Sequence, residues 1–425
     1  MNARDFTFHL LLRSDKTQAY SNILLENELK KSDLNPQDKA LATTLFYGVI
    51  EKRICLDYQL STVLSKPLKK LKPEVLIILR LGAYQLLFMD KIPVSAAINE
   101  SVKMTKKHKC AYASGLVNAC LHRIHKQGLC LPDENDESFL SVKYSVPEPL
   151  IDLWQKDYGK ETTREVLKSL SCKPQTVIRV NTLLTDVDAL QASLCESGVV
   201  THKNAWCEHS LVIEKSGDIT ALKQFQAGLF HVEDTAAQKA ALLLNAKAGE
   251  RVLDTCAAPG GKSFTVAEQM GSGSLSACDL YENRVALIKS GAERLHIDFI
   301  EALVMDATQY EPALGLFDRV LCDVPCSGLG IIRRKPEIRY KSLEELSAFP
   351  AIQLKILKTS FRYLKPGGTL VYSTCTLNRA ENEEVIAAFT AEHAQNAKVI
   401  LQKTFLPHID HTDGFFAAVI EKHES

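Results

Sequence analysis

Two cysteines stand in two short, different contexts: Asp323-Val324-Pro325-Cys326-Ser327 and Ser373-Thr374-Cys375-Thr376. Upstream lies a glycine-rich segment, Leu253-Asp254-Thr255-Cys256-Ala257-Ala258-Pro259-Gly260-Gly261-Lys262. A cysteine thiolate is a strong nucleophile that can form covalent intermediates. Together the three segments predict one reaction, in which a thiolate adds to a pyrimidine ring and the activated ring takes a methyl group from S-adenosylmethionine.

Cytosine itself explains why a thiolate is needed. Its C5 carbon is a poor nucleophile, whereas addition of a thiolate to C6 creates an enamine whose C5 can attack a methyl sulfonium. A free thiol has a pKa of about 8.5, so an electropositive setting must favour the thiolate. We expect Lys262 to contribute to that setting, and the residues alone leave open whether Cys326 or Cys375 is the nucleophile.

The glycine-rich segment predicts a tight turn between a strand and a helix. Gly260 and Gly261 would let the backbone approach a ligand closely. The ending Gly261-Lys262-Ser263 is typical of a phosphate-binding loop, but such a loop needs a glycine five positions before Gly261, where Cys256 stands. We therefore favour a methyl-donor site over an NTPase site, and a tight turn without a ligand is the structural alternative.

Two acidic residues are candidate donor ligands. Asp279 follows the second predicted strand, at the distance from the glycine turn where an acidic residue meets ribose hydroxyls. Asp306 follows the third strand and could receive the adenine amino group. Each could instead cap the N-terminus of a helix.

The hydrophobic pattern changes twice along the 425 residues. Residues 1–138 are predicted to form a helical domain, with helices opening at Pro36, Pro73 and Pro93. Residues 139–230 are predicted to form a small α+β domain. Residues 231–425 alternate strands and helices, which predicts a parallel sheet covered on both faces, with ligands beyond the carboxyl ends of its strands.

Charge, apolar runs and cysteine spacing limit the classes of function that the sequence allows. Residues 1–128 carry 20 Lys and Arg against 11 Asp and Glu, although the net charge of the whole chain is zero, so we expect the N-terminal domain to bind nucleic acid. No apolar run approaches the roughly 20 residues that span a bilayer. The 12 cysteines include no CxxC pair, so no metal site is predicted. These features predict a cytoplasmic protein without a membrane partner.

Motif by motif, residues 231–425 resemble the RNA cytosine-C5 methyltransferases of the RsmB/NOP family, and the resemblance extends over essentially the whole chain. It implies a NusB-like helical domain, a small α+β domain and a Rossmann-like class I methyltransferase core of α/β type. It also implies a monomer that methylates a cytidine of 16S rRNA, either naked or in an early assembly particle. Transfer RNA as the substrate, and a non-catalytic RNA-binding assembly factor, are the alternatives.

The resemblance also assigns roles. Cys375, of the Thr-Cys motif, would be the nucleophile, Cys326 would assist release of the methylated base, and Asp323 would bind the N3/N4 edge of cytosine. The methyl donor would contact Cys256, Ala257, Ala258, Pro259, Gly260, Gly261, Lys262, Asp279, Asp306 and Asp323. The basic run Arg333-Arg334-Lys335 would meet phosphates. Thr255, Val324 and Glu233 depart from the family pattern, and none of them removes a reacting group.

Overall fold

The protein is described by a computed structural model that covers residues 2–17 and 21–423. It divides into two compact units, one comprising 1–163 with 334–341 and the other 164–333 with 342–425. A short segment that follows the Pro-Cys motif thus belongs to the N-terminal unit. The domain boundaries at 138 and 230 stay predictions, because a division into two units does not test them.

The first unit is built from helices. They are α1 (Ala3–Thr17), α2 (Ser21–Lys30), α3 (Pro36–Glu51), α4 (Arg53–Val63), α5 (Pro73–Phe88), α6 (Val94–Lys107), α7 (Ser114–Gln127), α8 (Phe139–Tyr144), α9 (Glu148–Tyr158) and the short 3-10 helices η1 (Leu68–Lys70), η2 (Ala111–Ala113) and η5 (Pro336–Tyr340). Helix α10 (Lys160–Ser169) crosses the boundary at 163. The three predicted helix starts are confirmed, since Pro36 and Pro73 open α3 and α5 and Pro93 directly precedes α6.

The second unit begins with a small antiparallel sheet in the order β2-β3-β1-β4. Its elements are β1 (Thr176–Val180), α11 (Val187–Glu196), β2 (Val200–Lys203), β3 (Ser210–Lys215), η3 (Ile219–Ala221), α12 (Lys223–Gln226) and β4 (Phe230–Val232). Apolar residues of β1 and β3 pack with Leu190 and Leu194 of α11. This agrees with the predicted strand, helix and strand in this part of the chain.

The larger sheet has seven strands in the order β10-β11-β9-β8-β5-β6-β7. The elements are α13 (Thr235–Leu242), β5 (Arg251–Asp254), α14 (Gly261–Met270), β6 (Ser274–Asp279), α15 (Glu282–Arg294), β7 (Ile300–Val304), η4 (Pro312–Leu314), β8 (Phe317–Asp323), α16 (Leu343–Leu346), α17 (Phe349–Arg362), β9 (Leu364–Thr374), α18 (Glu383–His393), β10 (Ala397–Phe405), α19 (Pro407–Asp410) and β11 (Phe415–Lys422). The five predicted strands, β5 to β9, run parallel. The sheet as a whole is mixed, because β10 and β11, which the prediction lacked, are antiparallel.

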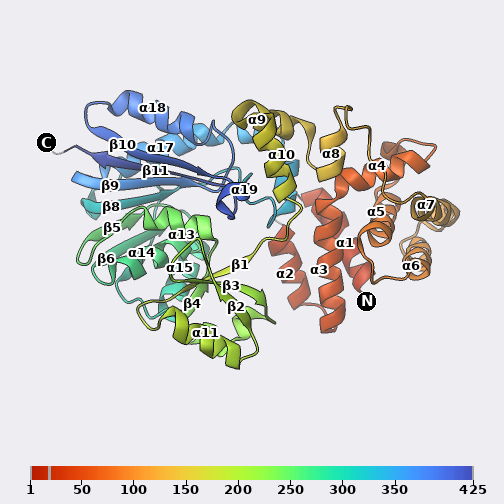
Figure 1. The fold of residues 1–425 in the computed structure, drawn as a ribbon, viewed down its shortest axis with the longest axis horizontal. Coiled ribbons are helices and arrows are strands. Elements are labelled where there is room, and N and C mark those ends of the chain that lie inside the picture. The colour runs from red at the N-terminus through yellow and green to blue at the C-terminus, as the bar shows by residue number, and fades with distance from the viewer. Residues whose placement is uncertain (1, 18–20, 424–425) are drawn as a thin grey trace. The chain divides into compact units, whose positions relative to one another are not determined.

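Helices cover both faces of this sheet, with α17 and α18 on one side and α13, α14 and α15 on the other (Figure 1). Successive strand residues point to opposite faces. Accordingly Val320 and Leu370 belong to the core under α17 and α18, whereas their neighbours Leu321 and Val371 belong to the opposite core. The strands are apolar along both faces, so polar residues are left for the strand ends. No helix in the described ranges is long and apolar enough to cross a membrane.

Candidate active site

The candidate residues gather where the parallel strands end. Asp254, Asp279 and Asp323 are the last residues of β5, β6 and β8, and Cys375 directly follows β9. Carboxyl ends of neighbouring parallel strands meet at one edge of a sheet, which is where open α/β folds bind ligands. Asp306 lies two residues beyond the end of β7.

The turn between β5 and α14 brings backbone close to this edge. Gly260 has a φ of +114°, a conformation that side chains with a Cβ rarely adopt. A Cβ added to Gly260 would lie 2.4 Å from the Phe264 ring, and one added to Gly261 would lie 2.9 Å from Glu233 Oε1. The backbone conformation therefore requires a glycine at 260, whereas a Cβ at 261 would displace the Glu233 carboxylate.

The side chains of Cys326 and Cys375 are in contact. Their sulfur atoms are 3.2 Å apart, and both residues are partly exposed. The hydrogen bond with Cys375, together with burial, raises the pKa of the Cys326 thiol well above its usual range. Either sulfur can be the donor of this hydrogen bond, so the two thiols share one hydrogen-bonded contact.

A buried carboxylate holds the two cysteine loops together. Glu381 Oε2 accepts hydrogen bonds from Ser327 N at 2.8 Å and from Gln353 Nε2 at 2.9 Å, and its Oε1 accepts from Asn378 Nδ2 at 2.9 Å. Gln353 also donates to the Pro325 carbonyl at 3.0 Å. Hydrogen bonds at Pro325 and Ser327, on either side of Cys326, thus link the Pro-Cys loop to Glu381. The bond at Ser327 is direct, and the bond at Pro325 runs through Gln353.

Lys262 and Asp323 form an ion pair at 2.9 Å between Nζ and Oδ2. Ser373 donates to the other oxygen of Asp323 at 2.6 Å. Burial alone would lower the pKa of Lys262, but the carboxylates of Asp323 and Glu233 outweigh it and hold that pKa above its usual value, with a further contribution from Cys375. Lys262 is therefore a firm cation near the Thr-Cys sulfur.

A cavity of about 180 Å³ opens between these groups. It is lined by Val232, Glu233, Ala237, Asp254, Cys256, Ala257, Ala258, Pro259, Gly261, Lys262 and Asp323. Asp254 lies at its buried end, where desolvation raises the pKa of the carboxyl to about 7 despite a hydrogen bond from Ser263. The cavity thus combines a firm cation, Lys262, with the carboxyl groups of Asp254, Glu233 and Asp323.

The structure places most of the predicted site residues together, but not all. Asp279 is buried, accepts a hydrogen bond from Tyr281 N and forms an ion pair with Arg284 at 3.4 Å. Arg284 also donates to the Ala258 carbonyl at 2.8 Å, which ties Asp279 to the glycine turn. Asp306 is exposed and accepts from Thr308 N at 2.9 Å. Asp279, Asp306 and Gly260 are not among the residues that line the cavity.

Two residues of the site had not been predicted to act there. Glu233 lines the cavity and accepts from Thr265 Oγ1 at 2.6 Å, and burial, which would raise its pKa, is outweighed mainly by His231 so that the pKa is lowered. Its only sequence signal was a departure from the family pattern. No sequence pattern indicated Arg284, because its contacts with Asp279 and with the Ala258 carbonyl form only when the fold brings the ends of β5 and β6 together.

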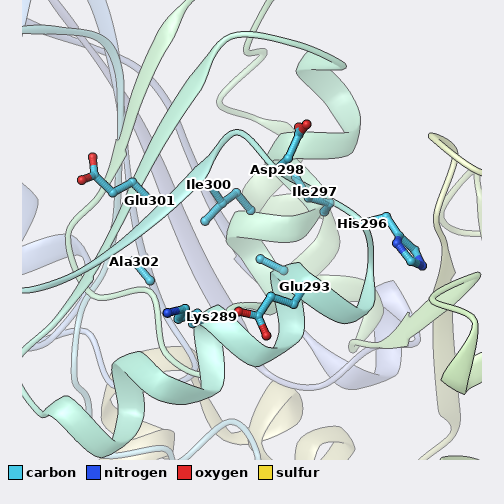
Figure 2. A pocket seen from close by; sticks show the side chains of 9 residues that line it. Lys289, Glu293, His296, Ile297, Asp298, Ile300, Glu301 and Ala302 are labelled. Atoms are coloured by element: carbon cyan, nitrogen blue, oxygen red, sulfur yellow. The ribbon is translucent and has the colours of Figure 1, made fainter.

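A second, larger hollow of about 660 Å³ lies between α15 and β7, and Figure 2 shows its lining. Lys289, Glu293, His296, Asp298 and Glu301 supply its polar side chains. It contains none of the predicted site residues. We therefore place the chemistry in the smaller cavity.

Comparison with known proteins agrees with this arrangement. The family model for the 16S rRNA methyltransferase RsmB/F matches residues 241–421, which include both cysteine loops. The NusB family matches residues 1–126, and the ferredoxin-like domain of RsmF/B-like methyltransferases matches residues 146–220. A probable ribosomal RNA small subunit methyltransferase B from Bacillus subtilis is 37% identical over 99% of each chain.

The chain belongs to the ribosomal RNA small subunit methyltransferase B family. The family member from Vibrio cholerae is 32% identical, with 92% of this chain and 91% of that protein covered. The same fold occurs in PH0851, whose crystal structure superposes on this chain with a TM-score of 0.83, at 25% identity and with 99% of both chains covered. NSun6 from Pyrococcus horikoshii, solved with SFG, shares the fold at 21% identity and a TM-score of 0.60, over 66% of this chain and 99% of that one.

Proposed function

We propose that this chain methylates C5 of a cytidine in 16S rRNA, with S-adenosylmethionine as the methyl donor and a covalent bond between Cys375 and C6 of the ring as the intermediate. The observation that carries the proposal is the contact of the two cysteine sulfur atoms, 3.2 Å apart, at the carboxyl ends of the parallel strands. Family membership supports the RNA substrate.

The residues around the cavity suit a bound methyl donor. Close approach at Gly261, the buried carboxylate of Asp279 and the turn from Cys256 to Pro259 offer backbone and acidic contacts of the kind that hold an adenosyl group. Asp306 is exposed beyond β7 and is proposed to meet the adenine amino group. When bound, the donor supplies an electrophilic methyl group on a sulfonium.

The nucleophile is assigned to Cys375. The ammonium of Lys262 favours a thiolate there, and Cys326 can donate its proton toward the Cys375 sulfur. The thiolate forms a bond to C6, and the electron pair moves to C5, which takes the methyl group. Cys326 in its thiolate form then takes the C5 proton, the electron pair of the C5–H bond re-forms the C5–C6 double bond, and Cys375 leaves C6 as a thiolate.

Asp323 is assigned to the substrate base. Its side chain is 26% exposed and its carboxylate can accept from the exocyclic amino group of cytosine while Lys262 and Ser373 fix its orientation. The adjacent Cys326 is assigned to the elimination step. As a thiolate, Cys326 can accept the C5 proton, which is what the elimination requires.

The experiment is methylation of deproteinised 16S rRNA and of early small-subunit particles with a tritium-labelled donor, followed by bisulfite mapping. We expect label at C5 of one cytidine in at least one of these substrates. Label on transfer RNA alone would favour that alternative substrate. Binding of rRNA without any transfer of label would favour the non-catalytic assembly factor.

A further inference from the structure

Trp206 is the exposed member of the two tryptophans of the chain. Its side chain is 47% exposed, whereas Trp154 is 1% exposed. It stands in the loop that joins β2 to β3. An indole ring is large and apolar, so leaving half of it in water forgoes a substantial part of its burial energy.

The loop that carries Trp206 is fixed to the methyltransferase core. Asn204 Oδ1 accepts from Trp206 N at 2.9 Å, and Asn204 Nδ2 donates to Thr235 Oγ1 at 2.8 Å, at the start of α13. The Asn204 backbone N–H also donates to the Ser210 carbonyl at 3.0 Å. The indole is therefore presented by a pinned turn rather than by a loose loop.

Two further side chains extend this surface. The ring of His411 is tilted 33° against Trp206, with 4.7 Å between the ring centroids. Lys239 of α13 places Nζ 5.8 Å from the centroid of the Trp206 ring. We call Trp206, His411 and Lys239 the aromatic patch. It combines two flat rings with the ammonium of Lys239.

The aromatic patch is connected to the catalytic loops by short contacts. Asp413, two residues after His411, donates its N–H to Asp234 Oδ1 at 3.3 Å, and Gly414 N donates to the Gly330 carbonyl at 2.9 Å. Gly330 N in turn donates to the Cys375 carbonyl at 3.1 Å. Phe415, which follows Gly414, has Lys262 Nζ over its ring, 5.1 Å from the ring centroid.

The aromatic patch also shares a helix with the lining of the cavity. Ala237 of α13 lines the cavity, and Lys239 lies two residues further along the same helix.

From these contacts we infer that the aromatic patch is a stacking subsite for an unpaired RNA base that neighbours the nucleotide in the cavity. The inference rests on the proposed function. RNA-binding proteins stack splayed bases on aromatic side chains, and Lys239, whose ammonium lies over the Trp206 ring, adds a cation beside the stacked base. A base held on Trp206 would fix the register of the strand, so that one cytidine enters the cavity.

The test compares Trp206→Ala with Trp206→Tyr in the full chain, with a short single-stranded oligoribonucleotide of mixed sequence as the probe. Trp206→Ala should weaken RNA binding by about tenfold, because a stacked base is lost, whereas Trp206→Tyr should stay within about twofold of wild type. The dependence of RNA affinity on salt should be the same in both variants and in wild type, because no phosphate contact changes.

Tryptophan fluorescence distinguishes a stacked base from a merely structural role of Trp206. RNA should quench the tryptophan emission of the wild type, and this quenching should vanish in Trp206→Phe, where only the buried Trp154 remains. Ile400→Ala, at a position 45% exposed on β10, is the matched surface control and should bind RNA like wild type. Donor affinity by calorimetry should be unchanged in every variant.

Unaltered RNA affinity of Trp206→Ala, or absence of quenching in the wild type, would overturn the stacking subsite. Equal losses in Trp206→Ala and Trp206→Tyr, accompanied by a lower melting temperature, would show a structural role and overturn it too. These failures are distinguishable from failure of the proposed function, because the wild type would then still transfer label to C5 of a cytidine.

Discussion

At the scale of single residues, the site places two thiols beside a firm cation. The Cys326 and Cys375 sulfur atoms are 3.2 Å apart, and the pKa of Lys262 is held above its usual value by Asp323 and Glu233, with a further contribution from Cys375. A nearby cation favours the thiolate, which is the reactive form of a cysteine. The family resemblance implies different roles for the two thiols.

Asp254 offers a test of the electrostatics of the cavity. Burial raises its pKa from 3.8 to about 7 in the folded state. A raised folded-state pKa stabilises the fold fully below about pH 4, and this contribution is lost as the pH rises through about 7. Asp254→Asn stays neutral throughout, so its free energy of unfolding minus that of wild type should rise between pH 4 and 8, by up to about 4 kcal/mol.

Urea unfolding followed by circular dichroism at several pH values measures this difference for Asp254→Asn. Asp306→Asn is a suitable control, because that carboxyl is exposed. If the difference in free energy of unfolding between Asp254→Asn and wild type stays constant between pH 4 and 8, the pKa of Asp254 is not raised in the folded state.

At the scale of elements, the site depends on loops that follow different strands. The Pro-Cys loop after β8 and the segment before β11 touch at Gly330 and Gly414. A Cβ on Gly330 would lie 1.9 Å from the Gly414 carbonyl oxygen and 2.9 Å from that of Cys375. Only a glycine allows this approach, so the position of the Pro-Cys loop is set by backbone contact.

Gly330→Ala should push the Pro-Cys loop away from Cys375. We expect the rate of methyl transfer to fall about tenfold or more, since small misplacements of reacting groups are costly, while donor affinity stays within about twofold. Single-turnover assays and calorimetry measure the two quantities. Gly217→Ala, where a Cβ would meet nothing within 4 Å, is the control and should be unaffected. A fully active Gly330→Ala enzyme would contradict the role of this contact.

Sequence patterns predicted the elements that carry strong local signals. The strands β5 to β9, the glycine turn and the strand-end acids were predictable because apolar runs ending in turn residues have few other interpretations. Strand β10 was missed because residues such as Lys398, Gln402 and Lys403 are exposed on this edge strand and blur its pattern. Residues 365–368, with the sequence Lys-Pro-Gly-Gly, lie within β9, where the pairing with β8 shifts register.

Long-range contacts could not be predicted in the same way. The approach of Gly330 to Gly414, the bonds of Glu381 to Ser327 and the tie between Arg284 and Asp279 join residues whose local sequences show no such pairing. The motifs thus predicted residues that the fold brings together, whereas the residues that position them carried no signal in the sequence.

At the scale of the whole molecule, the segment Arg334–Lys341 links the catalytic loop to the N-terminal unit by chain continuity. Arg339 is 2% exposed and donates to the carbonyls of Glu51, Tyr144 and Ser145 at 3.1 to 3.4 Å. Tyr340 donates to the Ile50 carbonyl at 2.8 Å. These carbonyls lie at the ends of α3 and α8, where helices leave acceptors unpaired and favour a cation.

Arg339→Met should therefore destabilise the first unit by about 3 kcal/mol, because buried carbonyls lose their donors. Arg339→Lys keeps the charge with fewer donors and should lie between Arg339→Met and wild type. Hydrogen exchange at the amides of α3 and α8 measures the effect. Unchanged protection in Arg339→Met would show that the segment is not needed for the unit.

The RNA-binding role of the basic N-terminal residues stays a prediction. Deleting 1–128 would also remove the Glu51 acceptor of Arg339, so substitutions of exposed lysines such as Lys69 and Lys70 test it more cleanly. We expect weaker RNA binding and a smaller salt dependence in such variants. Unaltered RNA affinity would assign this surface to another partner.

The central claim is that Cys375 attacks the base and Cys326 releases it, and the most direct measurement is trapping of a covalent protein–RNA adduct on denaturing gels. Cys326→Ala should accumulate an adduct with 16S rRNA in the presence of S-adenosylmethionine, because addition survives and elimination is impaired. Cys375→Ala should form no adduct and transfer no methyl group. An adduct trapped by Cys375→Ala and absent from Cys326→Ala would reverse the two roles and contradict the account.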